Sequence, residues 1–372
     1  MITRDSFIIS GYQKNFLPSR IPLFGSLANH LRTRGILLID NDIFGYSSAL
    51  NFYFCHGDFY PEFHGMAVGY DPFFYKNFAY SAGLRAEEHS SQKYSDLYES
   101  IRYNMNLQWT LYLLSVDLEF IKAHYPSMIL PKNTKNINGF LINVIGYDNE
   151  GLIIGSSFGA GEKHIPNRDW LELENRNNNC AIPLYPDTHR CFHWFYIDPP
   201  VAPNTETYPK IIMFKQAITK IIYKMNVPCS GLWCNGIQGM QKFFDYIVPF
   251  LTTRQIDEYG SNFLVNTIEI NKIIDPNRSF CRSLFCSFLC KIQDGFLPGK
   301  IDHILSLYLE LTGMWQKLTS ILEDTVSNTN NISANTVYKL ANEIILSEIK
   351  AIKYLEHLKE TLSVENNYNA EN

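Results

Sequence analysis

The chain of 372 residues is longer than a single hydrophobic core usually supports, so two domains are expected. Hydrophobic residues make up 46% of it and charged residues 19%, which indicates a globular rather than a disordered protein. The net charge of −5 and the lack of a basic run argue against a surface that binds nucleic acid. Small molecules or other proteins are therefore the expected partners.

The N-terminus has polar breaks and too short an apolar run for a signal peptide, and no segment approaches the roughly 20 apolar residues of a membrane span. We therefore expect a soluble, cytoplasmic protein with no membrane partner. None of the eight cysteines has the CxxC spacing of a zinc site. We expect them to be reduced and buried, and the sequence predicts neither a metal nor a cofactor.

The first well-marked element in chain order is a helix that begins at Pro22. Proline suits the first turn of a helix because its missing N–H would be unpaired there in any case. Leu23, Leu27 and Leu31 follow at intervals of four, so this helix is expected to pack one face inward. Gly35 suits its C-terminal end.

A hairpin is predicted over residues 139–154. Two apolar runs flank a polar turn at Asp148–Gly151, which is typical of two paired strands. Phe140 stands at the entrance of the first strand. Asp148 needs no catalytic role, because aspartate is common in turns.

The composition changes near residue 205, after a proline-rich stretch at 199–209. Short apolar runs separated by polar turns precede it, and apolar residues at helical spacing follow it. Ser327–Asn331 joins two long amphipathic segments, which predicts a helical hairpin at the C-terminal end. The predicted organisation is an α+β domain over 1–204, a helical domain over 205–364 and a disordered tail over 365–372.

Several of these segments together resemble the butirosin biosynthesis protein H family. The segments that carry the resemblance are Pro22–Gly35, Ile43–Gly45, Leu50–Phe54, Tyr94–Met105, Ser115–Leu118, the hairpin INVIGYDNEG, Gly236–Met240 and Arg278–Ile292. The resemblance implies a papain-like cysteine-peptidase or acyltransferase fold of the α+β class, followed by an all-helical domain.

The resemblance also implies thiol-dependent transfer of an acyl group from a carrier-protein thioester to an amine, in the biosynthesis of a secondary metabolite. Such chemistry needs a thiolate at a helix N-terminus, a histidine and a group that orients the histidine. The three matching positions in this sequence are Pro22, Phe140 and Ser156. We therefore expect a catalytically degenerate protein that binds an acyl intermediate, an acyl or peptidyl carrier protein, or a pathway enzyme.

An active acyltransferase with displaced catalytic residues is the alternative. Ser26 lies about one turn after Pro22, and Cys55 and His56 could supply a thiol and a base, although neighbours on a strand point to opposite faces. Asp117 either borders the cleft, as its match in the family does, or caps the helix that follows it. An unrelated α/β protein is a third possibility, and the C-terminal helices could form a homodimer.

Overall fold

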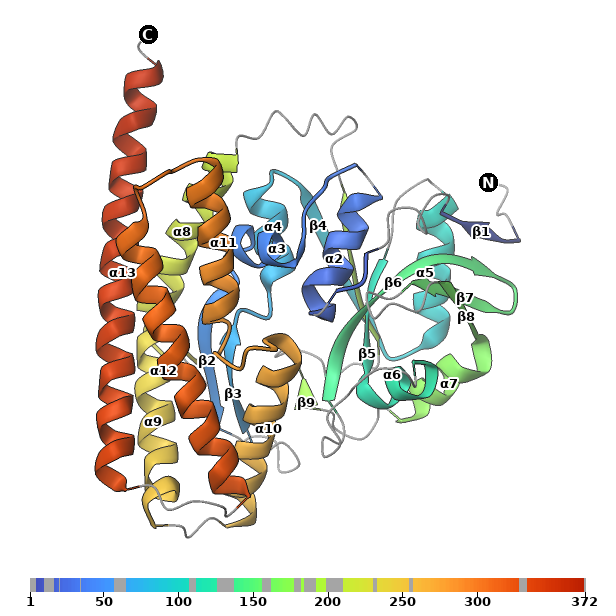
Figure 1. The fold of residues 1–372 in the computed structure, drawn as a ribbon. Helices are drawn as coiled ribbons and strands as arrows, with labels where there is room; N and C mark the ends of the chain where they lie inside the picture. The colour runs from blue at the N-terminus through green and yellow to red at the C-terminus, as the bar shows by residue number, and fades with distance from the viewer. Residues whose placement is uncertain are drawn as a thin grey trace. The chain divides into compact units, whose positions relative to one another are not determined.

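The structure is a computed structural model, and the chain in it is of the α+β class (Figure 1). It describes residues 5–9, 17–19, 21–33, 35–56, 65–106, 112–125, 137–155, 162–176, 182–183, 192–198, 210–229, 233–253, 257–327 and 333–370. The chain divides into two compact units, Met1–Ile43 with Tyr75–Tyr208, and Phe44–Phe74 with Pro209–Asn372. The division at Tyr208 lies close to the boundary predicted at residue 204. Residues 44–74, which the sequence analysis assigned to the first domain, belong to the second unit.

The first unit is built on a mixed sheet in which β6 is the central strand. The order β4-β10-β5-β6-β7-β8 is antiparallel throughout, and β1 (antiparallel) and β9 (parallel) also pair with β6. The strands are β1 (Phe7–Ile8), β4 (Arg85–Ser91), β5 (Tyr112–Asp117), β6 (Ile137–Asp148), β7 (Gly151–Gly155), β8 (Glu162–Pro166), β9 (Ile182–Pro183) and β10 (Phe192–Asp198). The predicted hairpin is thus confirmed as β6 and β7. The Asp148 carboxylate accepts from the amides of Glu150 and Gly151, so it stabilises the turn, as expected.

Helices cover both sides of this sheet. They are α2 (Pro22–Arg32), α4 (Phe74–Ser81), α5 (Tyr94–Asn106), α6 (Leu118–His124) and α7 (Asn167–Arg176). Helix α3 (Asp40–Tyr46) and helix α4 cross the boundaries of the units. Aromatic rings join α5, α6 and α7: Trp170 lies 4.7 Å from Phe120 and 5.9 Å from Tyr94, measured between ring centroids. Figure 1 shows α2 on the other side of β6 from α5.

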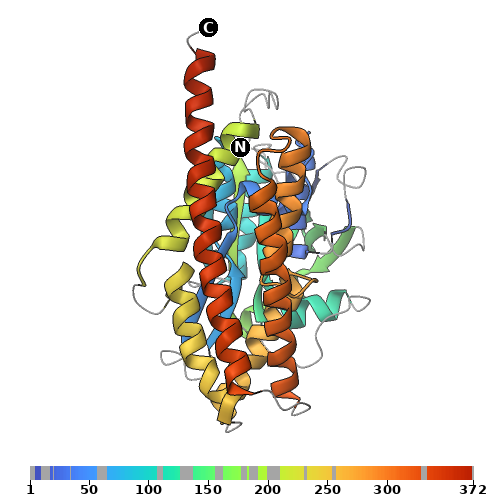
Figure 2. The same cartoon turned by 60° about the vertical axis from the view of Figure 1, so that its left-hand side comes forward.

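The second unit combines a small sheet with long helices. Its strands, in the order β11-β2-β3, are β2 (Leu50–His56), β3 (Gly65–Tyr70) and β11 (Trp233–Asn235). Its helices are α8 (Lys210–Asn226), α9 (Gly236–Thr253), α10 (Glu258–Ile274), α11 (Arg282–Gly295), α12 (Asp302–Val326) and α13 (Ala334–Ala370). The predicted C-terminal hairpin is confirmed as α12 and α13, which lie side by side in both views (Figure 2). Helix α13 continues to Ala370, where the sequence predicted a disordered tail.

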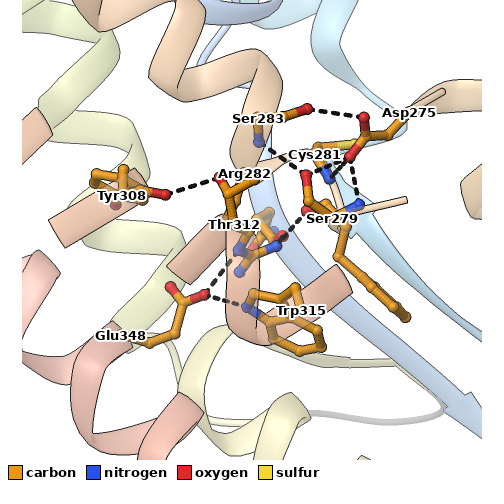
Figure 3. A network of polar contacts seen from close by, with 12 residues as sticks. Asp275, Ser279, Cys281, Arg282, Ser283, Tyr308, Thr312, Trp315 and Glu348 are labelled. Atoms are coloured by element: carbon orange, nitrogen blue, oxygen red, sulfur yellow. Dashed lines mark hydrogen bonds and ion pairs between the residues drawn. The ribbon is translucent and has the colours of Figure 1, made fainter. Parts of the chain in front are cut away.

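A buried ion pair lies between the helices of the second unit (Figure 3). The Arg282 Nε donates to Glu348 Oε1 over 2.7 Å, and both side chains are completely buried. The Trp315 Nε1 donates to the same oxygen over 2.8 Å, and the Arg282 guanidinium lies 5.0 Å from the centroid of the Trp315 ring. The Arg282 Nη1 also donates to the carbonyl of Asn51, so the segment 44–74 contributes to this network.

Candidate functional site

Helix α2, where the family's nucleophile is expected, is an interior helix. Pro22 occupies its first turn, and Ile21 at the N-cap provides no side-chain hydrogen bond. Every residue from Leu23 to Leu31 is buried, not only the leucine face that the sequence predicted. A helix buried on all sides belongs to the core of its domain. Pro22, the first residue of the helix, has neither a thiol nor a hydroxyl group.

Two polar side chains of α2 fix it to the sheet. The Ser26 hydroxyl donates to the Leu141 carbonyl of β6 over 2.6 Å. The His30 Nε2 lies 3.1 Å from the Ile197 carbonyl of β10, and because a carbonyl only accepts, Nε2 must carry the proton. Both side chains have no exposed surface. They therefore form a Ser–His pair one turn apart that stabilises the position of α2 and is closed to a substrate.

His30 was not among the site residues predicted from the sequence. The signal was available, because His30 follows Ser26 by four residues and both lie within the leucine-rich pattern of the helix. A histidine among buried leucines needs a hydrogen-bond partner. The partner, a carbonyl 167 residues further along the chain, could not be found by local spacing.

The Phe140 side chain is buried, with 2% of its surface exposed, and points away from α2. Phe140 and Ile142 lie on the same face of β6, because alternate residues of a strand do. Ile142 is opposite Leu114, which is opposite Trp194, so Ile142 and Trp194 share a face. The Trp194 indole donates to Ser100 Oγ of α5 over 3.3 Å, which identifies the face as the α5 side. Helix α2 lies on the other side (Figure 1).

Asp117 caps a helix. Its backbone is extended, and its carboxylate accepts from the Phe120 amide over 2.5 Å at the start of α6. This is the geometry of an N-cap aspartate, so the capping interpretation is confirmed. Asp117 also ends β5 opposite Asn138, close in register to Phe140.

Two of the remaining candidates belong to the second unit, whereas α2 belongs to the first. Cys55 and His56 lie on β2 of the second unit, where His56 is opposite Gly65. Burial, followed by the charge of Cys234, raises the pKa of Cys55 to about 12, so its thiol is a poor nucleophile. Ser156, the third family position, lies outside the described residues.

A cluster of titratable side chains that the sequence analysis missed lies on the α2 side of the sheet. The Glu88 Oε1 of β4 accepts from the Tyr75 hydroxyl over 2.6 Å and from the His193 Nε2 of β10 over 2.5 Å. Lys76 forms an ion pair with the other oxygen of Glu88. The Tyr75 ring stacks on the Phe195 ring, with 3.8 Å between the ring centroids. Phe195 lies two residues after His193 on the same strand.

The charge state of Glu88 follows from these contacts. Burial alone would raise its pKa, but hydrogen bonds from His193, Lys76 and Tyr75 outweigh burial and hold the pKa at about 2. Glu88 is therefore a carboxylate at neutral pH, oriented towards an imidazole. His193 is opposite Ser115, and Ser115 is opposite Leu141, whose carbonyl binds Ser26. His193 thus lies in the cross-strand row that ends at Leu141, and Glu88, which is opposite Phe195, lies on the same face two residues along.

No group of three or more His, Cys, Asp and Glu side chains within the described residues is arranged to hold a metal ion. No helix among those residues is long and apolar enough to cross a membrane. The chain matches no family model and no curated protein.

Proposed function

We propose that this protein is a catalytically degenerate relative of butirosin biosynthesis protein H that acts by binding an acyl intermediate, a carrier protein or a pathway enzyme. The proposal is supported by an interior helix that begins where the family's nucleophilic helix begins and is packed against the first strand of the GYDNEG hairpin. The observation that carries the loss of catalysis is the hydrogen bonding of that helix. Ser26 and His30 are buried and bind backbone carbonyls, and the Phe140 side chain points to the opposite face.

Acyl transfer tests this proposal directly. The protein is mixed with an acyl-loaded carrier protein and a panel of amines, carrier binding is measured by calorimetry, and amide product is followed by mass spectrometry. The proposal predicts binding with no product above the uncatalysed reaction. The Ser26→Ala variant is the matched probe, because it removes only the hydroxyl nearest the family's nucleophile position. Product that disappears in this variant would contradict the proposal.

The Glu88–His193 pair favours a second candidate, an acyltransferase with displaced catalytic residues. An imidazole oriented by a carboxylate is the arrangement of a general base, and general-base catalysis contributes roughly a hundredfold to ten-thousandfold to a rate. In this candidate, His193 takes the proton of the attacking amine and Glu88 orients its ring. Turnover would then require His193.

Single substitutions separate the two candidates. His193→Gln and Glu88→Gln would each reduce turnover about a hundredfold or more if the pair were catalytic. His89→Asn is the matched control, since His89 neighbours Glu88 on the same strand but stacks on Trp194, on the other face of the sheet. Product formation that depends on His193 but not on His89 would favour the second candidate over the first.

A further inference from the structure

A groove in the second unit lies between α9 and α13, which are side by side in both views (Figure 2). Its volume is about 680 Å³, which is enough for a small organic molecule. Its walls include Gln241, Asp245 and Pro249 of α9, and Tyr338, Asn342 and Leu346 of α13. The groove is thus built within one unit, by two helices that are far apart in the sequence.

The groove has one negative charge. Asp245 is the only charged side chain among the described residues that line it. Within the described part of the chain, the Asp245 carboxylate forms no hydrogen bond and no ion pair, and the side-chain amides of Gln241 and Asn342 form no hydrogen bond. A carboxylate flanked by two such amides favours a cation over an anion as the ligand.

Pro249 adds a backbone acceptor to the same wall. It lies inside α9, and because proline has no N–H, the Asp245 carbonyl loses the hydrogen bond that residue 249 would otherwise donate. A helix carbonyl points along the axis towards the residue four positions later, and both Asp245 and Pro249 line the groove. The carboxylate and the carbonyl of Asp245 therefore offer more than one acceptor to a group with several N–H donors, such as an ammonium group.

Apolar surface lies beside these acceptors. Leu346 is 66% exposed and Tyr338 is 53% exposed, although both are large hydrophobic side chains. Phe244 and Val248 also line the groove and are buried. Exposed apolar side chains next to a carboxylate suit a ligand that has an apolar body and a cationic end.

We propose that the groove between α9 and α13 binds a small organic ammonium ion with an apolar body. The carboxylate and the carbonyl of Asp245 accept hydrogen bonds from the ammonium group, and Tyr338 and Leu346 pack against the apolar body. This site lies in the second unit and does not depend on the binding function proposed for the first unit.

Titration of the full-length protein with 2-phenylethylamine, followed by ligand-observed NMR, tests this proposal. The neutral analogue 2-phenylethanol has the same ring and chain but no charge. The amine is expected to bind about tenfold more tightly than the alcohol at neutral pH, because hydrogen bonds between charged groups are the stronger ones. Pro249→Ala is expected to weaken amine binding about threefold, because the alanine N–H takes up the Asp245 carbonyl. Unchanged affinity in this variant would overturn the role of the carbonyl.

Two matched substitutions test the role of the charge. Asp245→Asn is expected to abolish the preference for the amine. Asp294→Asn changes the net charge equally at an exposed position on α11 that does not line the groove, so the preference is expected to remain. The proposal is overturned if the amine binds no more tightly than the alcohol, or if the two substitutions have equal effects.

A second copy of the chain is the competing occupant of the groove. Sedimentation equilibrium of the wild type and of Leu346→Glu distinguishes it from a small ligand, because a glutamate at this position would disrupt an apolar interface between copies. The proposal expects the two proteins to have the same mass in solution. A wild-type dimer that Leu346→Glu dissociates would overturn it, since the groove would then be an interface.

Discussion

At the scale of single residues, the buried charge of Arg282 requires a balancing charge in the interior of the second unit. Its guanidinium is completely buried, and the carboxylate that balances it is contributed by Glu348, 66 residues further along the chain. A buried ion pair that loses one charge leaves the other without compensation, which costs about 3–5 kcal/mol.

Glu348→Gln is therefore expected to lower the free energy of unfolding by about 3–5 kcal/mol, measured by urea denaturation. Glu343→Gln on the same helix is the matched control. Glu343 pairs with Lys339 at the surface, so the same substitution is expected to cost about 0.5 kcal/mol or less. Equal effects of the two substitutions would show that burial does not set the energy of the Arg282–Glu348 pair.

The depressed pKa of Glu88 predicts a contribution to acid stability. A carboxyl whose pKa falls on folding, here from 4.5 to about 2, stabilises the folded state above its unfolded pKa. That stabilisation is lost as the pH falls from 4.5 through about 2. The wild type should therefore lose more stability than Glu88→Gln between neutral pH and pH 2, measured by urea denaturation at each pH. Parallel pH profiles of the two proteins would refute this.

At the scale of the elements, close helix packing explains the glycine of Ile43–Gly45. A Cβ on Gly45 of α3 would lie 2.2 Å from the Phe288 ring of α11. Gly313 lies within α12, and a Cβ there would meet no atom within 4 Å. Glycine and alanine differ in helix propensity by about 1 kcal/mol in favour of alanine, so packing alone distinguishes the two sites.

Gly313→Ala is expected to raise the free energy of unfolding by up to about 1 kcal/mol. Gly45→Ala is expected to lower it by about 1–3 kcal/mol, because the added methyl group forces the Phe288 ring out of its position. Thermal denaturation of both variants provides the measurement. Stabilisation by Gly45→Ala would mean that the contact between α3 and α11 is looser than the structure shows.

Local sequence patterns predicted several helices and strands. The contacts that depend on long-range strand pairing could not be predicted from such patterns. Pro22 and the leucines after it predicted α2, the polar turn at Asp148 predicted the β6–β7 hairpin, and Ser327–Asn331 predicted the break between α12 and α13. The register that brings His193 to Glu88 connects residues 105 positions apart, so no local period reveals it. The capping role of Asp117 could be predicted from the sequence, because a helix cap depends on neighbouring residues only.

At the scale of the whole molecule, the chain crosses between its two units more than once. The boundary predicted at residue 204 lies close to the last crossing, after Tyr208. Residues 44–74, in contrast, belong to the second unit and supply β2 and β3 to its sheet. Composition could not reveal this, because an aromatic strand looks the same whichever unit it joins. The second unit therefore depends on two separate stretches of sequence.

A fragment of residues 209–372 alone is thus expected not to fold. It lacks two of the three strands of its sheet and the Asn51 carbonyl that binds Arg282. Circular dichroism should show helix without a cooperative unfolding transition. A fragment in which residues 44–74 are joined to 209–372 by a flexible linker is the control and should recover cooperativity. Cooperative unfolding of the shorter fragment would contradict the division of the chain.

The proposed function of the first unit is binding without acyl transfer. Its most direct test is amide formation from an acyl-loaded carrier protein, measured at a protein concentration where calorimetry shows the carrier to be bound. The expected result is a rate equal to the uncatalysed rate, for the wild type and for Ser26→Ala alike. Catalysed product formation that one substitution at Ser26, His30 or His193 abolishes would contradict this expectation.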